Sequence, residues 1–124
     1  MTNPFSDQEK FMRACDQTTG GAIDEAQYAM YRKLIAEEVG ELHDAVENND
    51  RVEQLDALID ILVVTIGALH SMGADAEGAW KEVLQTNLAK IDPATGKVIK
   101  REDGKVLKPE GWKPPDLAGF LKGY

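Results

Sequence analysis

The stretch YRKLIAEEVGELHDAV, residues 31–46, places acidic side chains within the apolar face of a helix. Apolar residues recur there at the spacing of an amphipathic helix: Tyr31, Leu34, Ile35, Val39, Leu42, Ala45 and Val46. At about 100° per residue, Glu38 projects into the middle of this face, Glu41 falls at its edge and Glu37 lies just beyond. A carboxylate within an apolar face is costly unless its charge is compensated. The chain must therefore supply something that compensates Glu38.

Turn residues and capping residues divide the chain into four helical segments. We expect helices near residues 5–15, from Asp24 to about Glu47, over 51–73, and from after Asp75 to about Lys90. Asp50 and Asp75 are expected as N-caps, because their short carboxylates can accept the free N–H groups of a first turn. We expect the inward-facing residues of the last two helices to be Leu55, Leu58, Ile59, Leu62, Ile66, Leu69, Ala79, Val83 and Leu84.

The third segment carries more apolar surface than one small chain can cover. From Ile61 to Val64 it is apolar all round, which indicates burial on every side. Four helices with one short member hardly supply that cover. We therefore expect association with a second chain.

The character of the sequence changes after the fourth helix. KVIKREDGKVLK, residues 97–108, has two β-prone arms around Asp103-Gly104, which predicts a hairpin. PEGWKPPDLAGF then predicts an irregular, proline-rich segment. We interpret residues 1–124 as one domain, with a helical body over about 1–91 and a basic tail over about 92–124.

Composition excludes several classes of partner. The net charge of −8 at pH 7 argues against a nucleic-acid backbone or an anionic membrane. The single cysteine, Cys15, excludes an internal disulfide. The N-terminus lacks an apolar signal core, and the longest apolar run is far shorter than the ~20 residues that span a bilayer. A soluble, cytoplasmic protein is expected.

The third predicted helix, like the second, carries acidic side chains among its apolar residues. Asp56 and Asp60 lie one turn apart on the same face, and a short turn between the helices makes them antiparallel. This arrangement can bring Glu38 and Glu41 opposite Asp56 and Asp60. Such carboxylates either protonate, with raised pKa values, or bind a hard divalent cation. The alternative to a metal site is a solvated acidic helix face, because glutamate forms helices well. Aspartate is only a moderate helix former, so helix propensity does not explain two aspartates in an apolar helix.

The kind of metal follows from the ligand types. A di-iron bundle uses Glu-x-x-His motifs, but Gly40 and Gly67 stand three residues before His43 and His70. A carboxylate-only set favours Mg²⁺ or Mn²⁺. Such ions usually serve phosphate chemistry, for which the basic tail could hold the phosphates.

Four blocks in order carry a resemblance to a known family: EEVGEL, DALIDILVVTIGALHSMGAD, TNLAKID and REDGKVLKPEGWKPPDL. They resemble the MazG-like all-α nucleoside triphosphate pyrophosphohydrolases, closest to the short house-cleaning members related to phosphoribosyl-ATP pyrophosphohydrolase. The resemblance implies an antiparallel helical bundle completed by dimerisation, as a homodimer or a dimer of dimers. It also implies cleavage of a nucleoside or deoxynucleoside triphosphate to the monophosphate and pyrophosphate. Phosphoribosyl-ATP is a related substrate, but the long basic tail favours house-cleaning.

The family's Glu-Glu-x-x-Glu motif falls on Glu37, Glu38 and Glu41. We expect Glu38 and Glu41, with Asp56 and Asp60, to hold Mg²⁺ or Mn²⁺. Glu37 is the candidate general base for the attacking water, or a ligand to a second ion.

The second motif, Glu-x-x-Asp, shows a departure. Its Asp falls on Asp60, but its Glu falls on Ala57. Asp56, one turn before Asp60, is the natural substitute ligand. A shifted register would use Glu53 and Asp56 instead. The lost Glu also leaves open a different reading, a non-catalytic nucleotide-sensing or partner-binding helical dimer.

The Asn-x-x-Lys element of the family falls on Asn87 and Lys90, which by resemblance touch the nucleotide. The structural alternatives are a helix-capping Asn87 and a solvated Lys90 favoured by the helix dipole. Trp112 either packs near the base or pins the tail to the bundle. Candidates for phosphate contact in the tail are Arg101, Lys105 and Lys108.

Overall fold

The computed structural model describes residues 3–122. The elements follow one another as α1 (Pro4–Ala14), α2 (Glu25–Glu47), α3 (Arg51–Ser71), α4 (Ala76–Leu88), β1 (Ile91–Asp92), β2 (Lys97–Val98) and a short 3-10 helix, η1 (Ala118–Phe120). The predicted all-α class is confirmed. The four predicted helices are present, and their ends differ from the expected ones by a residue or two.

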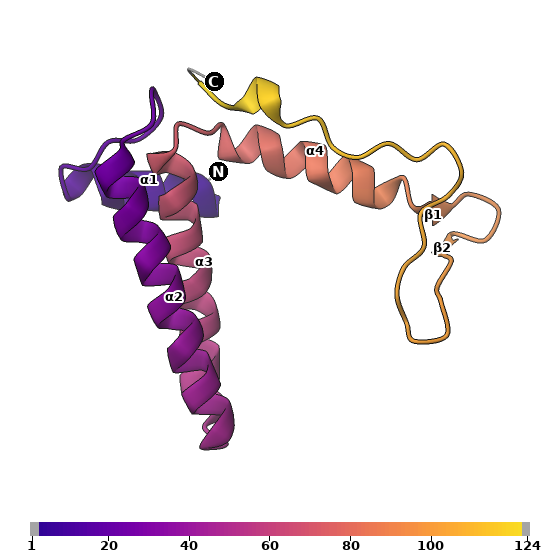
Figure 1. Cartoon of the computed structure of the whole chain (residues 1–124), viewed down its shortest axis with the longest axis horizontal. Coiled ribbons are helices and arrows are strands. Elements are labelled where there is room, and N and C mark those ends of the chain that lie inside the picture. The colour runs from indigo at the N-terminus through magenta and orange to yellow at the C-terminus, as the bar shows by residue number, and fades with distance from the viewer. Residues whose placement is uncertain (1–2, 123–124) are drawn as a thin grey trace.

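Aspartate side chains begin the last three α-helices. Asp24, Asp50 and Asp75 each accept a hydrogen bond from the backbone N–H three residues later. These caps satisfy donors that a first helical turn otherwise leaves free. Between α2 and α3, Asn49 adopts a φ of 54°, a left-handed conformation that asparagine tolerates. The tight turn makes α2 and α3 antiparallel neighbours along their length (Figure 1).

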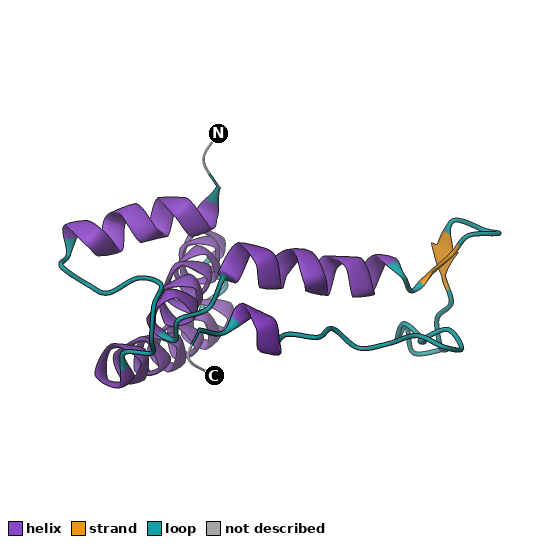
Figure 2. Ribbon diagram, turned by 90° about the horizontal axis from the view of Figure 1, so that it is seen from above, coloured by secondary structure: helices purple, strands orange, loops and turns teal. Residues whose placement is uncertain are grey.

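The core lies at the end of this helix pair that is remote from the turn. Met12 of α1 is fully buried there against Tyr31 of α2 and Ala68 of α3. Nε2 of the buried His70 donates a 2.8 Å hydrogen bond to the carbonyl of Phe5, which ties α1 to α3. Figures 1 and 2 show α1 lying across this end of the pair.

Helix α4 turns away from the α2–α3 pair, and the tail runs back alongside it (Figure 2). We call α4 together with residues 89–122 the arm. Its end is anchored at the base of α4, where Asp75 N–H donates to the carbonyl of Phe120 at 2.7 Å and Ala74 bridges Leu121.

The regular strands form a short β-hairpin directly before the predicted one. Strands β1 and β2 pair Ile91 with Val98 and Asp92 with Lys97. The arms around Asp103-Gly104 also pair, through a bridge between Lys100 and Val106 and through backbone hydrogen bonds from Arg101 N–H to the Lys105 carbonyl (2.7 Å) and from Leu107 N–H to the Ile99 carbonyl (2.8 Å). The first hairpin is closed by a turn after β1, in which the Asp92 carbonyl accepts the N–H of Gly96 at 2.8 Å. This turn recruits residues 97–98 to β1.

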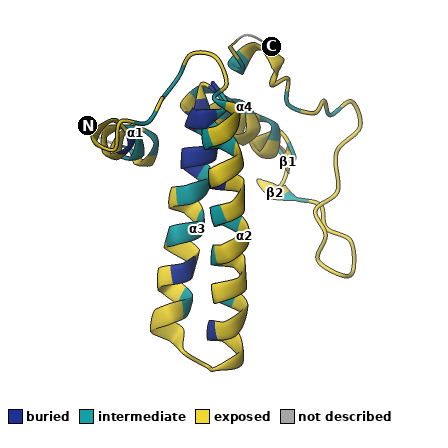
Figure 3. Cartoon of the chain, turned by 60° about the vertical axis from the view of Figure 1, so that its left-hand side comes forward, coloured by how far each residue is buried: buried dark blue, intermediate teal, exposed yellow. Residues whose placement is uncertain are grey.

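Much of α3 is exposed within the single chain (Figure 3). Leu55 and Leu62 are 63% and 58% exposed, although both were expected to face inward. Val83 and Leu84 of α4 are also exposed. These expectations are wrong for one chain, because the divergence of α4 leaves the outer face of α3 without cover. Among the described residues, no helix combines the length and apolarity needed to cross a bilayer.

Candidate active site

The predicted carboxylates of α2 and α3 form one electrostatic group. Burial raises the pKa of Glu38, and the neighbouring carboxylates of Glu41, Asp60 and Asp56 raise it further. The antiparallel turn is what sets the two acidic pairs opposite one another. The structure therefore places these four carboxylates where their charges act on one another, and the metal site proposed for them stays a prediction.

Asp60, on α3, is likewise partly buried among carboxylates. Burial raises its pKa, and the charges of Asp56 and Glu41 add to the effect. Oε2 of Glu38 is shielded from solvent and has no hydrogen-bond partner within the described chain. A carboxylate oxygen so placed is unfavourable, since it has lost water without gaining a donor. Within residues 3–122, no positively charged side chain contributes to either pKa shift.

The donor chemistry fits a hard divalent cation. Mg²⁺ and Mn²⁺ take oxygen ligands, and the group offers carboxylates only, one of them with a shielded, unpartnered oxygen. Within residues 3–122, no three acidic, histidine or cysteine side chains are already close enough to hold a metal ion. The carboxylates would have to close around the ion.

Three further positions on these helices bear on the ligand set. Glu37 is exposed on α2, beside Glu38 and beyond the edge of the apolar face. Ala57, where the family motif would carry Glu, is only 3% exposed. Glu53 lines a cavity of about 300 Å³ together with Glu41 and Asp50. Asp56, unlike Glu53, contributes directly to the raised pKa values of Glu38 and Asp60.

The predicted nucleotide-binding pair lies at the far end of α4. Nζ of Lys90 donates to Oδ1 of Asn87 at 3.1 Å. The helix is capped by Ala89, so Asn87 is not its C-cap. Helix α4, whose far end holds this pair, points away from the α2–α3 pair of the same chain (Figure 1).

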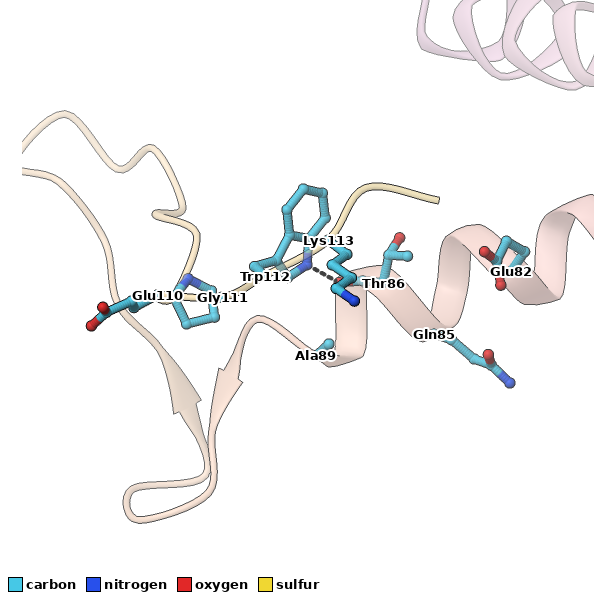
Figure 4. Close-up of a pocket in the computed structure, with 9 residues that line it drawn as sticks. Glu82, Gln85, Thr86, Ala89, Glu110, Gly111, Trp112 and Lys113 are labelled. Atoms are coloured by element: carbon cyan, nitrogen blue, oxygen red, sulfur yellow. Dashed lines mark hydrogen bonds between the residues drawn. The ribbon is translucent and has the colours of Figure 1, made fainter. Parts of the chain in front are cut away.

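Trp112 pins the tail to α4. Its indole Nε1 donates a 2.7 Å hydrogen bond to the carbonyl of Thr86 (Figure 4). This is the structural role considered for Trp112, with α4 as the anchor. A cavity of about 360 Å³ beside the indole is lined by Gln85 and Thr86, which the sequence did not single out. Only the return of the tail makes this face of α4 concave.

The other tail cations are differently placed. Both Arg101 Nε and Nη2 donate to the carboxylate of Asp103, two residues away. Lys105 is exposed in the same turn. Neither residue is brought to the carboxylate group of its own chain.

The fold and the carboxylate group define an all-α protein with an acidic helix pair and a basic arm. The sequence model of the phosphoribosyl-ATP pyrophosphohydrolase family matches residues 6–87, well over half of the chain. The chain belongs to this family, which lies within the MazG-like superfamily. The match includes the acidic helices and ends before Lys90 and the tail. Family membership indicates a nucleotide pyrophosphohydrolase-like function, and thus a hydrolase. A search of curated proteins finds no significant match.

Proposed function

We propose that this protein hydrolyses nucleoside or deoxynucleoside triphosphates to the monophosphate and pyrophosphate with Mg²⁺ or Mn²⁺. Its proposed role is house-cleaning of the nucleotide pool in the cytoplasm. The observation that carries the proposal is the shielded, unpartnered oxygen of Glu38 among three other carboxylates, in a chain of a pyrophosphohydrolase family. A carboxylate group in which no described cation lowers the pKa of Glu38 or Asp60 suits a metal-dependent hydrolase.

The residues have distinct proposed roles. Glu38, Glu41, Asp56 and Asp60 hold the ion between the two helices. A bound divalent cation supplies charge stabilisation at phosphate oxygens. Glu37, exposed at the polar edge of the group, takes the proton of the attacking water, or else ligates a second ion.

The arm supplies the contacts to the nucleotide. Asn87 and Lys90 are proposed to contact the substrate, with Lys90 directed at phosphate. Arg101 and Lys105 remain candidates for phosphate contact, although Arg101 would first have to leave Asp103. A lysine or arginine bound to phosphate makes a strong, charge-assisted hydrogen bond.

A second copy of the chain completes the proposed enzyme. The exposed Leu55 and Leu62 of α3 suit an interface between copies, because contiguous apolar surface of this kind is costly in water. The arm leaves its own helix pair, so a homodimer or dimer of dimers can bring Lys90 to a partner's carboxylates.

One observation favours a second candidate function. Ala57 packs almost fully buried where the family motif carries Glu, and a chain that has lost a ligand can persist as a nucleotide-sensing or partner-binding helical dimer. Phosphoribosyl-ATP remains an alternative substrate for an active enzyme.

The deciding experiment is pyrophosphate release from a panel of NTPs, dNTPs and phosphoribosyl-ATP, with Mg²⁺, with Mn²⁺ and with chelator. We expect metal-dependent release of pyrophosphate rather than orthophosphate, greatest with a triphosphate. If folded protein that binds metal releases no pyrophosphate from any compound of the panel, the result would favour the sensing dimer. Release of orthophosphate alone would contradict the proposed bond cleavage.

A further inference from the structure

Two lysine side chains converge on Trp112. Nζ of Lys90 lies 5.1 Å from the centroid of the indole ring, and Nζ of Lys108 lies 4.9 Å from it. The two ammonium groups are therefore no more than about 10 Å apart. A tryptophan face attracts cations, which explains why each lysine is drawn to the ring.

The indole is itself held in place. Its Nε1 donates to the Thr86 carbonyl at 2.7 Å, and the backbone N–H of Trp112 donates to the Pro109 carbonyl at 3.1 Å. This last bond closes a turn directly after Lys108, in which Gly111 adopts a φ of 78°. The turn fixes Lys108 of the tail beside Lys90 of the helix end.

Neither ammonium is neutralised. Within residues 3–122, no carboxylate forms an ion pair with Lys90 or Lys108. Two like charges gathered without a counterion repel one another, so an anion that contacts both of them is favoured.

The two lysines also border one cavity of about 310 Å³. Its apolar walls are Ile91, Pro93, Ile99, Leu107 and Pro109. Two acidic residues line it as well. Asp92 is engaged in its own turn, since its Oδ1 accepts the Ala94 N–H at 2.9 Å, and Glu110 is exposed. The cavity is thus an apolar recess bordered by both lysine residues, beside the indole on which their ammonium groups lie.

We propose that Lys108 binds a phosphate group of the substrate together with Lys90, and that Trp112 positions both. This assignment rests on the proposed function for the identity of the anion, and it selects one cation from the tail. Arg101 is the weaker candidate, because Asp103 already occupies its guanidinium.

Inorganic tripolyphosphate provides the test, because its binding needs no hydrolysis. Calorimetry on the full-length chain with Mg²⁺ would compare the wild type with Lys108→Ala, Lys108→Arg and Lys97→Ala. Lys97, exposed in β2 of the same arm and outside the cavity, controls for the loss of one positive charge. We expect roughly a tenfold or greater loss of affinity for Lys108→Ala, near-wild-type affinity for Lys108→Arg, and less than about a twofold loss for Lys97→Ala.

The outcomes separate this inference from the proposed enzyme. If Lys108→Ala binds as the wild type does, or Lys97→Ala loses as much, Lys108 has no specific role and the inference fails, whether or not nucleotides are hydrolysed. Failure of the wild type to bind tripolyphosphate also overturns it. Lys108-dependent binding by a protein that hydrolyses none of the panel would sustain the inference and refute the enzyme.

Discussion

The ring of Tyr31 on α2 packs directly against the backbone of Gly67 on α3, and a Cβ at residue 67 would overlap Tyr31. The Tyr31 hydroxyl meanwhile donates to Oε1 of Gln17, which fixes the ring on the far side. This contact sets how closely α2 and α3 approach, and so helps to place the carboxylates farther along the pair.

Gly67→Ala should destabilise the fold by about 1–3 kcal/mol, because the ring cannot yield without breaking the core. In an open helix the same change stabilises by up to about 1 kcal/mol. Gly40→Ala on α2 is the matched control, since a Cβ there meets nothing within 4 Å. Urea denaturation measures both free energies of unfolding. A stabilised Gly67→Ala variant would show that the Tyr31 contact is absent in solution.

Glu38→Gln should behave in opposite ways without and with a divalent cation. In chelator, we expect a higher melting temperature than the wild type, because one of the crowded charges is removed. Millimolar Mg²⁺ or Mn²⁺ should raise the wild-type melting temperature by roughly several degrees and leave the variant nearly unmoved. Thermal scans measure both effects, with Glu47→Gln at the exposed end of α2 as control. An equal metal response in Glu38→Gln would remove Glu38 from the ligand set.

Asp56 and Glu53 make different predictions about the lost motif residue. Asp56→Asn should weaken metal binding roughly tenfold, because it removes one charged ligand, whereas Glu53→Gln should change it little. Isothermal titration with Mn²⁺ distinguishes them, and the reverse order would establish the shifted register.

Ala57→Glu should lower stability in chelator by about 2 kcal/mol or more, since it places an unpaired charge at a buried site.

Trp112→Ala should free the tail and leave the helical body intact. The change removes the hydrogen bond to Thr86 and the ring on which Lys90 and Lys108 lie. We expect faster tryptic cleavage at the tail lysines, with unchanged helical circular dichroism. Trp80→Ala, on the exposed side of α4, is the control and should retain wild-type cleavage of the tail. Equal protection of the tail in Trp112→Ala would show that the pin is dispensable.

Mixing two inactive variants tests whether the arm serves a partner. In a dimer whose arms act in trans, Glu38→Gln and Lys90→Ala chains form hybrid dimers with one intact site of two. Statistical mixing then restores about a quarter of wild-type activity. Arms that act within their own chain restore none. Pyrophosphate release after co-refolding, compared with each variant alone, is the measurement.

Local sequence accounts for much of this molecule. The spacing of apolar residues and the aspartate caps predicted the helices, because these signals act within one or two turns. The convergence of Glu38, Glu41, Asp56 and Asp60 was predictable for the same reason: helical period and a short turn determine which faces meet. The proposed metal, substrate and partner follow from this chemistry and remain predictions.

Tertiary structure decided the course of the arm, and hence which side chains the single chain leaves uncovered. The direction of α4 depends on a turn at Gly73, whose φ is 78° and where a Cβ would collide with the carbonyl oxygen of Gly21. The tail's return depends on Trp112 reaching Thr86, across 26 residues. Such contacts join residues remote in sequence, so no local period encodes them. These contacts keep Lys90 away from the carboxylates of its own chain, and they place Lys108 beside Lys90.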